Sequence, residues 1–226
     1  KMNGRASMCY EGFPYRVREL RGGVRIDGRN ARIDNLSAAR GPMQCTIDGT
    51  LSDVGTERCR VRLDIKGTDL PLDEHLAAAA GQLGLDALEQ ARPSGSASEF
   101  SVSVWQDPGK DEKLRYSALV RLDDVAFSLR QFPYEITDTC GDVTITPGQV
   151  ILEGLSGRHG PTRVKGSGQI CLGDDSAGLD LNISAKDLKL DAELEGALPP
   201  AFKRAWEGLS PAGSADVELH LRGALP

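Results

Sequence analysis

The chain has 226 residues, of which 39% are hydrophobic and 27% charged, and its net charge is −6 with an isoelectric point near 5.2. These values are typical of a folded soluble protein and exclude a disordered chain, which combines low hydrophobicity with high charge. Basic residues such as Arg16, Arg18, Arg21 and Arg25 alternate with apolar or acidic ones. We therefore predict no nucleic-acid partner, because phosphates require a basic stripe.

The sequence predicts no membrane-spanning helix, and its first residues do not predict a signal peptide. No stretch approaches the ~20 uninterrupted apolar residues that a span needs, and the first residues lack a charged-then-apolar pattern. The chain begins in what looks like a strand and ends at Ala224-Leu225-Pro226. We interpret it as a segment of a longer polypeptide, with targeting signals and a membrane tether expected outside it.

The dominant hydrophobic pattern is alternation, which predicts half-buried antiparallel strands. In chain order, the alternating apolar positions are Val24/Ile26, Cys45/Ile47, Val61/Leu63/Ile65, Phe100/Val102/Val104, Leu114/Tyr116/Ala118/Val120/Leu122 and Leu179/Leu181/Ile183. The pairs expected in turns are Asp27-Gly28, Asp48-Gly49, Pro147-Gly148, Asp174-Asp175, Gly22-Gly23 and Gly41-Pro42. The predicted fold class is mainly β with short helices (α+β).

Two helical segments interrupt the predicted strands. Asp73 is expected to cap a helix that ends at Arg92-Pro93 and carries Leu76, Ala80, Leu83 and Leu88. Pro200 suits the first turn of a second helix, which carries Phe202, Ala205, Trp206 and Leu209 before Pro211. The residues expected to pack these segments onto the sheet are Leu76, Leu83, Leu194 and Trp206.

The sequence also contains an internal repeat. Phe13-Pro14-Tyr15 recurs as Phe132-Pro133-Tyr134, an offset of 119 residues. The same offset pairs Val24/Val143, Ile26/Ile145, Ile33/Leu152, Leu36/Leu155, Gly41-Pro42/Gly160-Pro161 and Gly49/Gly168. An offset of 118 then pairs Ile65/Ile183, Asp69/Asp187, Asp73/Asp191 and Leu76/Leu194, and an offset of 117 pairs Val102/Leu219. We predict two tandem antiparallel units, residues 1–110 and 111–226, each with one helical excursion on its sheet.

No catalytic, cofactor or metal motif is recognisable. The cysteines form no C-x-x-C or Cys/His cluster, and Cys45 and Cys59 lie in apolar runs where a free thiol behaves as a small hydrophobe. The histidines His75, His159 and His220 are far apart, and His159 aligns with Arg40, which predicts an ordinary surface position. The repeated carboxylates Asp73 and Asp191 stand where helix N-caps are expected. We therefore predict a protein that is not an enzyme.

Each repeat has the same order of elements: an aromatic-Pro turn after a strand, a "G.v.i..g...i..l....G" stretch, a "G.l" strand, an alternating strand closing on "DL.LD..L", a helix, and "P.Gs.d...l.l". This order resembles the AsmA-like family of bacterial envelope proteins, which includes the TamB and YhdP relatives. The resemblance covers residues 6–104 and 125–221. Because the family is recognised by its repeated β pattern, the resemblance concerns architecture first.

The resemblance implies serial β-units that form a long, curved, open sheet with an apolar concave face. It implies a location in the periplasm or cell envelope, and transport of phospholipid acyl chains between the inner and outer membranes or a part in outer-membrane assembly. The implied partners are phospholipids and neighbouring repeats of the same longer chain. The expected lipid-contact residues are Val24, Ile26, Val61, Leu63, Ile65, Val143, Ile145, Leu179, Leu181 and Ile183.

Two other interpretations are open. In the first, the chain is a purely structural β spacer or scaffold whose apolar faces are fully covered, since a half-buried sheet normally has a cover. In the second, it is a β-sandwich hydrolase or carbohydrate-binding domain, which the low content of Trp and Tyr disfavours.

Overall fold

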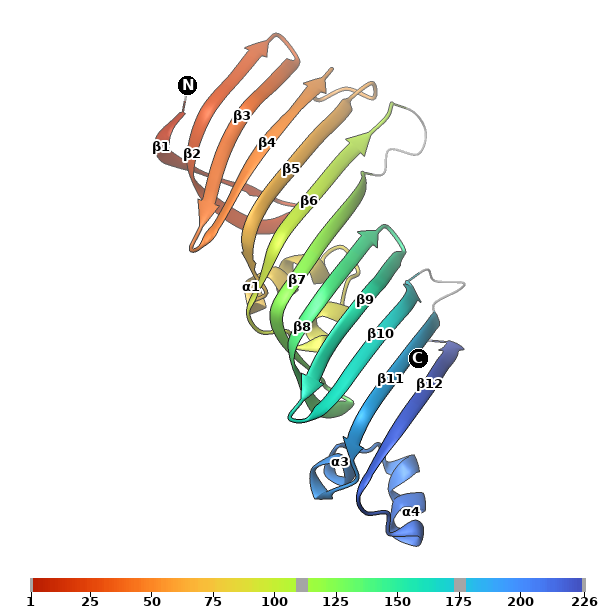
Figure 1. Cartoon of the computed structure of the whole chain (residues 1–226). Helices are drawn as coiled ribbons and strands as arrows, with labels where there is room; N and C mark the ends of the chain where they lie inside the picture. The colour runs from red at the N-terminus through yellow and green to blue at the C-terminus, as the bar shows by residue number, and fades with distance from the viewer. Residues whose placement is uncertain (1, 109–113, 173–177, 225–226) are drawn as a thin grey trace.

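The twelve strands found among the described residues belong to one antiparallel sheet. The computed structural model describes residues 2–108, 114–172 and 178–224. The strands lie side by side in the order in which they occur in the chain, so each one pairs with its sequence neighbours (Figure 1). The predicted fold class, mainly antiparallel β with a few short helices, is confirmed. The predicted boundary between residues 110 and 111 lies outside the described residues, and β6 and β7 on either side of it pair directly.

Six strands precede that boundary: β1 (Met2–Tyr10), β2 (Phe13–Asp27), β3 (Asn30–Arg40), β4 (Met43–Ser52), β5 (Arg60–Pro71) and β6 (Ser96–Gln106). Six follow it: β7 (Arg115–Leu129), β8 (Phe132–Thr146), β9 (Gln149–His159), β10 (Thr162–Cys171), β11 (Gly178–Lys189) and β12 (Ser214–Ala224). The helices α1 (Glu74–Gly81) and α2 (Ala87–Ala91) join β5 to β6, and α3 (Ala192–Ala197) and α4 (Pro200–Leu209) join β11 to β12.

Three of the six predicted turns connect strands as expected. Gly28 starts the loop between β2 and β3 with a φ of 57°, a left-handed backbone that glycine adopts without strain. Gly41-Pro42 and Pro147-Gly148 also form two-residue loops between strands. The expectation for Asp48-Gly49 and for Gly22-Gly23 is wrong, because both pairs lie inside strands. Asp174-Asp175 lies outside the described residues.

Each helical excursion consists of two short helices. The carboxylate of Asp73 accepts a hydrogen bond from Leu76 N at 2.8 Å, and that of Asp191 accepts one from Leu194 N at 3.1 Å, so both predicted N-caps are confirmed. The prediction of one helix from Asp73 to Arg92 is wrong in its middle, where Gly84, with a φ of 76°, lies in the turn between α1 and α2. Leu83 lies in that turn and is exposed instead of packing on the sheet.

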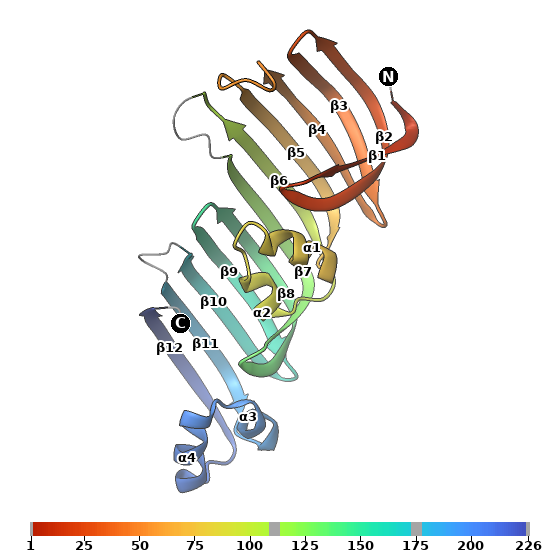
Figure 2. The ribbon, with the colours of Figure 1, turned by 180° about the vertical axis from the view of Figure 1, so that it is seen from behind.

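Three hydrophobic cores lie on one face of the sheet. The largest joins β2–β7 and α1 and includes Leu20, Leu36, Met43, Leu76 and Ala79, each at most 9% exposed. A second core joins Tyr134 and Ile136 of β8 to Leu194 and Ala197 of α3. The third places Ala80 and Leu85 of the first excursion against Val150 of β9. Figure 2 shows α1 and α2 lying over this face, with the ends of β1 and β2 folded across it.

Two buried threonines offer a test of the packing. Thr139 is 1% exposed and its hydroxyl has no hydrogen-bond partner, whereas Thr162 is 0% exposed and its hydroxyl donates to the carbonyl of Asp187 at 3.0 Å. We expect Thr139→Val to leave stability unchanged or to raise it, and Thr162→Val to lower the free energy of unfolding by about 1 kcal/mol. Denaturant unfolding of both variants checks this. A free energy of unfolding that falls more in Thr139→Val than in Thr162→Val would contradict the prediction.

Helix α4 is less buried than its sequence predicts. Phe202 and Leu209 are 61% and 78% exposed, and only Trp206 packs, half-buried, against the second core. We therefore expect Trp206→Ala to cost about 1–2 kcal/mol instead of the ~3–5 kcal/mol of a fully buried tryptophan. Leu194→Ala, at a site 5% exposed, should cost more, about 2–5 kcal/mol. Thermal melts that reverse this order would show that α4 is held more tightly than its exposure indicates.

Candidate functional site

The candidate site is the apolar face of the sheet, where side chains from successive strands line up in rows. Because directly paired residues point to the same side of a sheet, the strand register defines these rows. The first row is Ile47, Ile65, Val102, Ala118, Ile145, Val150, Ile170 and Leu179. The second is Cys45, Gly67, Phe100, Val120, Val143, Leu152, Gly168, Leu181 and Leu221. Neither row contains a charged residue.

A shorter third row lies nearer the opposite ends of the strands. It consists of Val24, Ile33, Gly49, Leu63, Val104 and Tyr116. Gly49 lies in this row because its neighbour strand comes very close: a Cβ there would overlap the carbonyl oxygen of Arg62. Gly168 meets the carbonyl of Asp180 in the same way. These two glycines serve close strand approach, which explains why Gly49 does not mark a turn.

The register places all ten predicted lipid-contact residues on this one face. Nine are half-buried, and Ile26 is 76% exposed. Their surroundings differ. Val24 and Ile65 pack at the margin of the first core, and Val143 and Ile145 at the margin of the third. Within the described residues, the six members outside all three cores are Ile26, Val61, Leu63, Leu179, Leu181 and Ile183.

The face is therefore covered in part. The hairpin ends of β1–β2 and of β7–β8, together with α1 and α3, cover one side of it and bury residues such as Leu36 and Ile136. Leu85, between α1 and α2, covers the middle strands β8–β10. Leu63 and Leu181 lie beyond these covers on either side of that segment.

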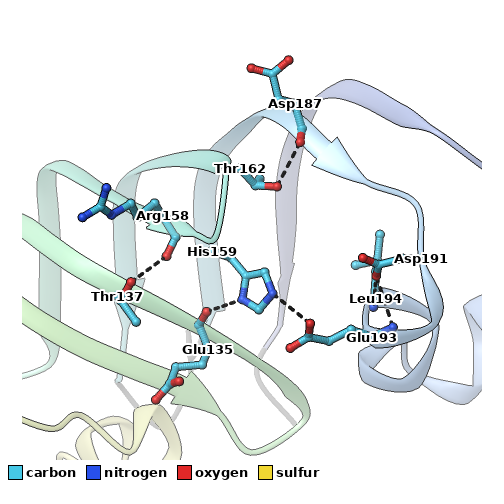
Figure 3. Close-up of polar contacts among 9 residues, drawn as sticks. All are labelled: Glu135, Thr137, Arg158, His159, Thr162, Asp187, Asp191, Glu193 and Leu194. Atoms are coloured by element: carbon cyan, nitrogen blue, oxygen red, sulfur yellow. Dashed lines mark hydrogen bonds and ion pairs between the residues drawn. The ribbon is translucent and has the colours of Figure 1, made fainter.

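His159 is held by three neighbours, so the expectation of an ordinary surface position is wrong. Its Nδ1 donates to the carbonyl of Glu135 at 2.7 Å, and its Nε2 lies 3.3 Å from the Glu193 carboxylate (Figure 3). Its ring stacks on Tyr134 with centroids 3.8 Å apart. These contacts tie β9 to the start of α3.

Arg40, which lies 119 residues earlier, makes matching contacts. Its guanidinium lies 4.3 Å from the ring centroid of Tyr15, donates to the carbonyl of Arg16 and lies 3.9 Å from the Asp73 carboxylate. A cation over an aromatic ring, tied to a helix start, stabilises the packing of helix on sheet. We therefore assign His159 a structural role.

Three further carboxylates lie on β5 and β11. On β11, Asp180 accepts hydrogen bonds from Arg222 and His220 of β12, and these bonds hold the pKa of its carboxyl below the ordinary value. Asp69 and Asp187 adopt a left-handed backbone, with φ of 56° at each, near the ends of β5 and β11. Within residues 2–108, 114–172 and 178–224, no group of three His, Cys, Asp or Glu residues could hold a metal ion.

The polar face carries a cluster of basic side chains, although the sequence predicts that they are dispersed. Arg16, Arg18, Arg21 and Arg25 alternate along β2, and alternation was interpreted as dispersal. In a strand every second residue points to the same side, so strict alternation would place Arg16 and Arg18 on one face and Arg21 and Arg25 on the other. The register shift between Arg18 and Arg21, where Glu19 has a φ of 55°, brings all four to the side opposite the apolar rows, and all four are exposed. The strand period alone does not reveal this cluster, because it depends on the bulge.

The comparisons with known proteins add no relative. A scan against protein-family models, a search of curated proteins and a search of solved structures each found no match to this chain. Among the described residues, none of the helices is both long enough and apolar enough to cross a membrane.

Thiol reactivity can distinguish covered from open parts of the apolar face. Cys45 is buried, as predicted, and burial raises the pKa of its thiol, whereas Cys59 lies just before β5 instead of in a strand. In chains with a single thiol, we expect Leu63→Cys to react with a maleimide at least about tenfold faster than Cys45, because it is less buried and its thiolate is more populated. Equally slow reaction at both positions would show that Leu63 is covered too.

Proposed function

We propose that this chain is a lipid-handling module of an AsmA-like envelope protein, which binds phospholipid acyl chains on the apolar face of its sheet. The observation that carries the proposal is the set of uncharged rows, parts of which lie outside the cores and stay half exposed. Contiguous apolar surface of this kind is rare on monomeric proteins unless something binds to it. Acyl chains fit because their binding requires burial and no specific polar contact.

The energetics of this binding are additive along the acyl chain. Each CH₂ transferred from water onto the sheet contributes ~0.8 kcal/mol. The rows run across the strands, so a chain lying along them would contact Leu63 and Val104 in turn. Because the cover at β8–β10 separates Leu63 from Leu181, we propose two acyl-binding stretches, one on each side of α1 and α2.

We further propose that the chain consists of two copies of one unit, β1–β6 and β7–β12. Supporting this, the bounds of β2, β3 and β4 shifted by 119 residues are those of β8, β9 and β10. The bounds of β5 and β6 shifted by 118 are those of β11 and β12. Stacked copies would align equivalent apolar residues, as a continuous path for lipid requires.

Uncommon backbone angles recur at the same offsets. Positive φ values occur at Glu19 and Asp138, at Gly22 and Gly141, and at Asp69 and Asp187. Ile65 pairs with Val102, and Ile183 with Leu219, which reproduces the offsets of 118 and 117 found in the sequence. Neither agreement is expected of two unrelated sheets that happen to be joined.

The spacer interpretation is the second candidate, and one observation favours it. Leu85 covers Val143 and Ile145, two of the expected lipid contacts, so the first excursion acts as a lid on β8–β10. A sandwich is excluded for the described residues because their strands form one sheet.

The test adds charge to the open stretches. In Leu63→Asp with Leu181→Asp, we expect a native circular-dichroism spectrum and loss of photo-crosslinking to phospholipid, because an open face can hydrate a new carboxylate that repels acyl chains.

The matched control is Thr50→Asp with Asn182→Asp, which adds the same charge on the opposite face of the sheet and should keep crosslinking. Unfolding of the first variant would mean that Leu63 and Leu181 are core, and the spacer interpretation would then replace lipid transport.

A further inference from the structure

Five exposed arginines form a basic patch at the N-terminal end of the sheet. The basic patch consists of Arg5 on β1 and Arg16, Arg18, Arg21 and Arg25 on β2. Arg5, Arg16 and Arg18 line one shallow hollow, together with Gly4, Ala6, Ser7 and Glu19. The strands β1–β3 lie at the opposite end of the sheet from β12, α3 and α4 (Figure 1).

The charge of the basic patch is not neutralised within the described part of the chain. None of its five guanidiniums forms an ion pair there, although ten ion pairs occur among the described residues. Arg25 even pairs directly across the ladder with Arg32, an arrangement of like charges that destabilises a sheet. Asp34 forms an ion pair with Arg32, at 2.7 Å, but not with Arg25. An anionic partner would offset this repulsion.

The fold does not require arginine at these positions. The residues 119 positions later, on β8, are Glu135 for Arg16, Thr137 for Arg18, Cys140 for Arg21 and Thr144 for Arg25. Residues 2–33 contain seven arginines and three acidic residues, whereas residues 121–152 contain two arginines and five acidic residues. Two segments of one sheet, whose strand bounds match closely, thus differ in the sign of their charge, which points to a role for the arginines outside folding.

Exposed apolar side chains lie in the same hairpin. Met8 and Tyr10, near the turn between β1 and β2, are 41% and 58% exposed. Met8 pairs with Val17 and Tyr10 with Phe13, so both point to the apolar face, whereas Arg16 and Arg18 point to the opposite one. The hairpin thus presents basic side chains on one face and exposed apolar ones on the other, and a bilayer surface offers phosphates and an acyl region to such a segment. A polyanion such as nucleic acid would satisfy the arginines but leave Met8 without an apolar environment.

We propose that the basic patch docks this end of the sheet on the surface of an anionic phospholipid bilayer. This inference rests on the proposed function only for the choice of a phospholipid partner, and it concerns the opposite face of the sheet. Docking would bring the β2 end of the sheet close to the membrane, with the half-exposed row that starts at Val24 on the other side of the same strands. The sheet would then extend away from the bilayer toward β12.

The experiment is vesicle co-sedimentation of the full chain. The vesicles contain phosphatidylcholine alone or with about 30% phosphatidylglycerol, at about 0.05 M and 0.5 M NaCl. We expect binding to the anionic vesicles only, weakened by salt. Replacing Arg16, Arg18, Arg21 and Arg25 by Thr should lower the partition coefficient at least about a hundredfold, because each basic residue near such a surface contributes to binding.

The control variant replaces four basic residues of β10 and β11, namely Arg163, Lys165, Lys186 and Lys189, by Thr. It changes the net charge equally and should bind as the unmodified chain does. Equal loss in both variants, or binding to single-stranded DNA stronger than to anionic vesicles, would overturn the proposal.

Leu63→Asp with Leu181→Asp should retain vesicle docking. Its result therefore separates failure of the acyl-binding face from failure of the basic patch. Circular dichroism of each variant confirms that the fold is retained before binding is scored.

Discussion

The structure depends on one constraint: a single sheet with an apolar face has no second sheet to cover it. Every strand alternates, so the twelve strands together present rows of aliphatic side chains on one side and charged or polar ones on the other. Water cannot hydrate such a face without a large free-energy cost. The chain's own strand ends and helices cover part of this face and shield it from water. The rest of the face stays uncovered.

The covers depend on bent strands. Register shifts interrupt the β1–β2 and β7–β8 ladders, and Glu19 and Asp138 have positive φ in the bent regions. Bulges of this kind increase the local twist and bend a strand. The bends allow each hairpin end to fold over the sheet and bury residues such as Leu20 and Ile136. Where strands stay straight, near Leu63 and Leu181, the apolar face has no such cover.

Alternation and capping were enough to predict the strands, their antiparallel order and the N-caps at Asp73 and Asp191. The failures have physical causes. Gly49 resembles a turn residue because the sequence does not distinguish a glycine that supplies a positive φ in a turn from one that allows two strands to come close together. His159 is held by groups that only folding brings near it. For the candidate site, the face of all ten residues followed from period two, but the cover by Leu85 depends on how the excursion folds back, which no local pattern encodes.

We propose that acyl chains bind on one face of this sheet. Fluorescence quenching by lipid tests this binding most directly. A single tryptophan is placed at Leu63, or at its neighbour Arg62 on the opposite face, in a chain whose Trp105 and Trp206 are replaced by Phe. Phosphatidylcholine with brominated acyl chains is then added. We predict strong quenching at position 63 and little at position 62. Equal quenching at both positions, or none at position 63, would contradict it.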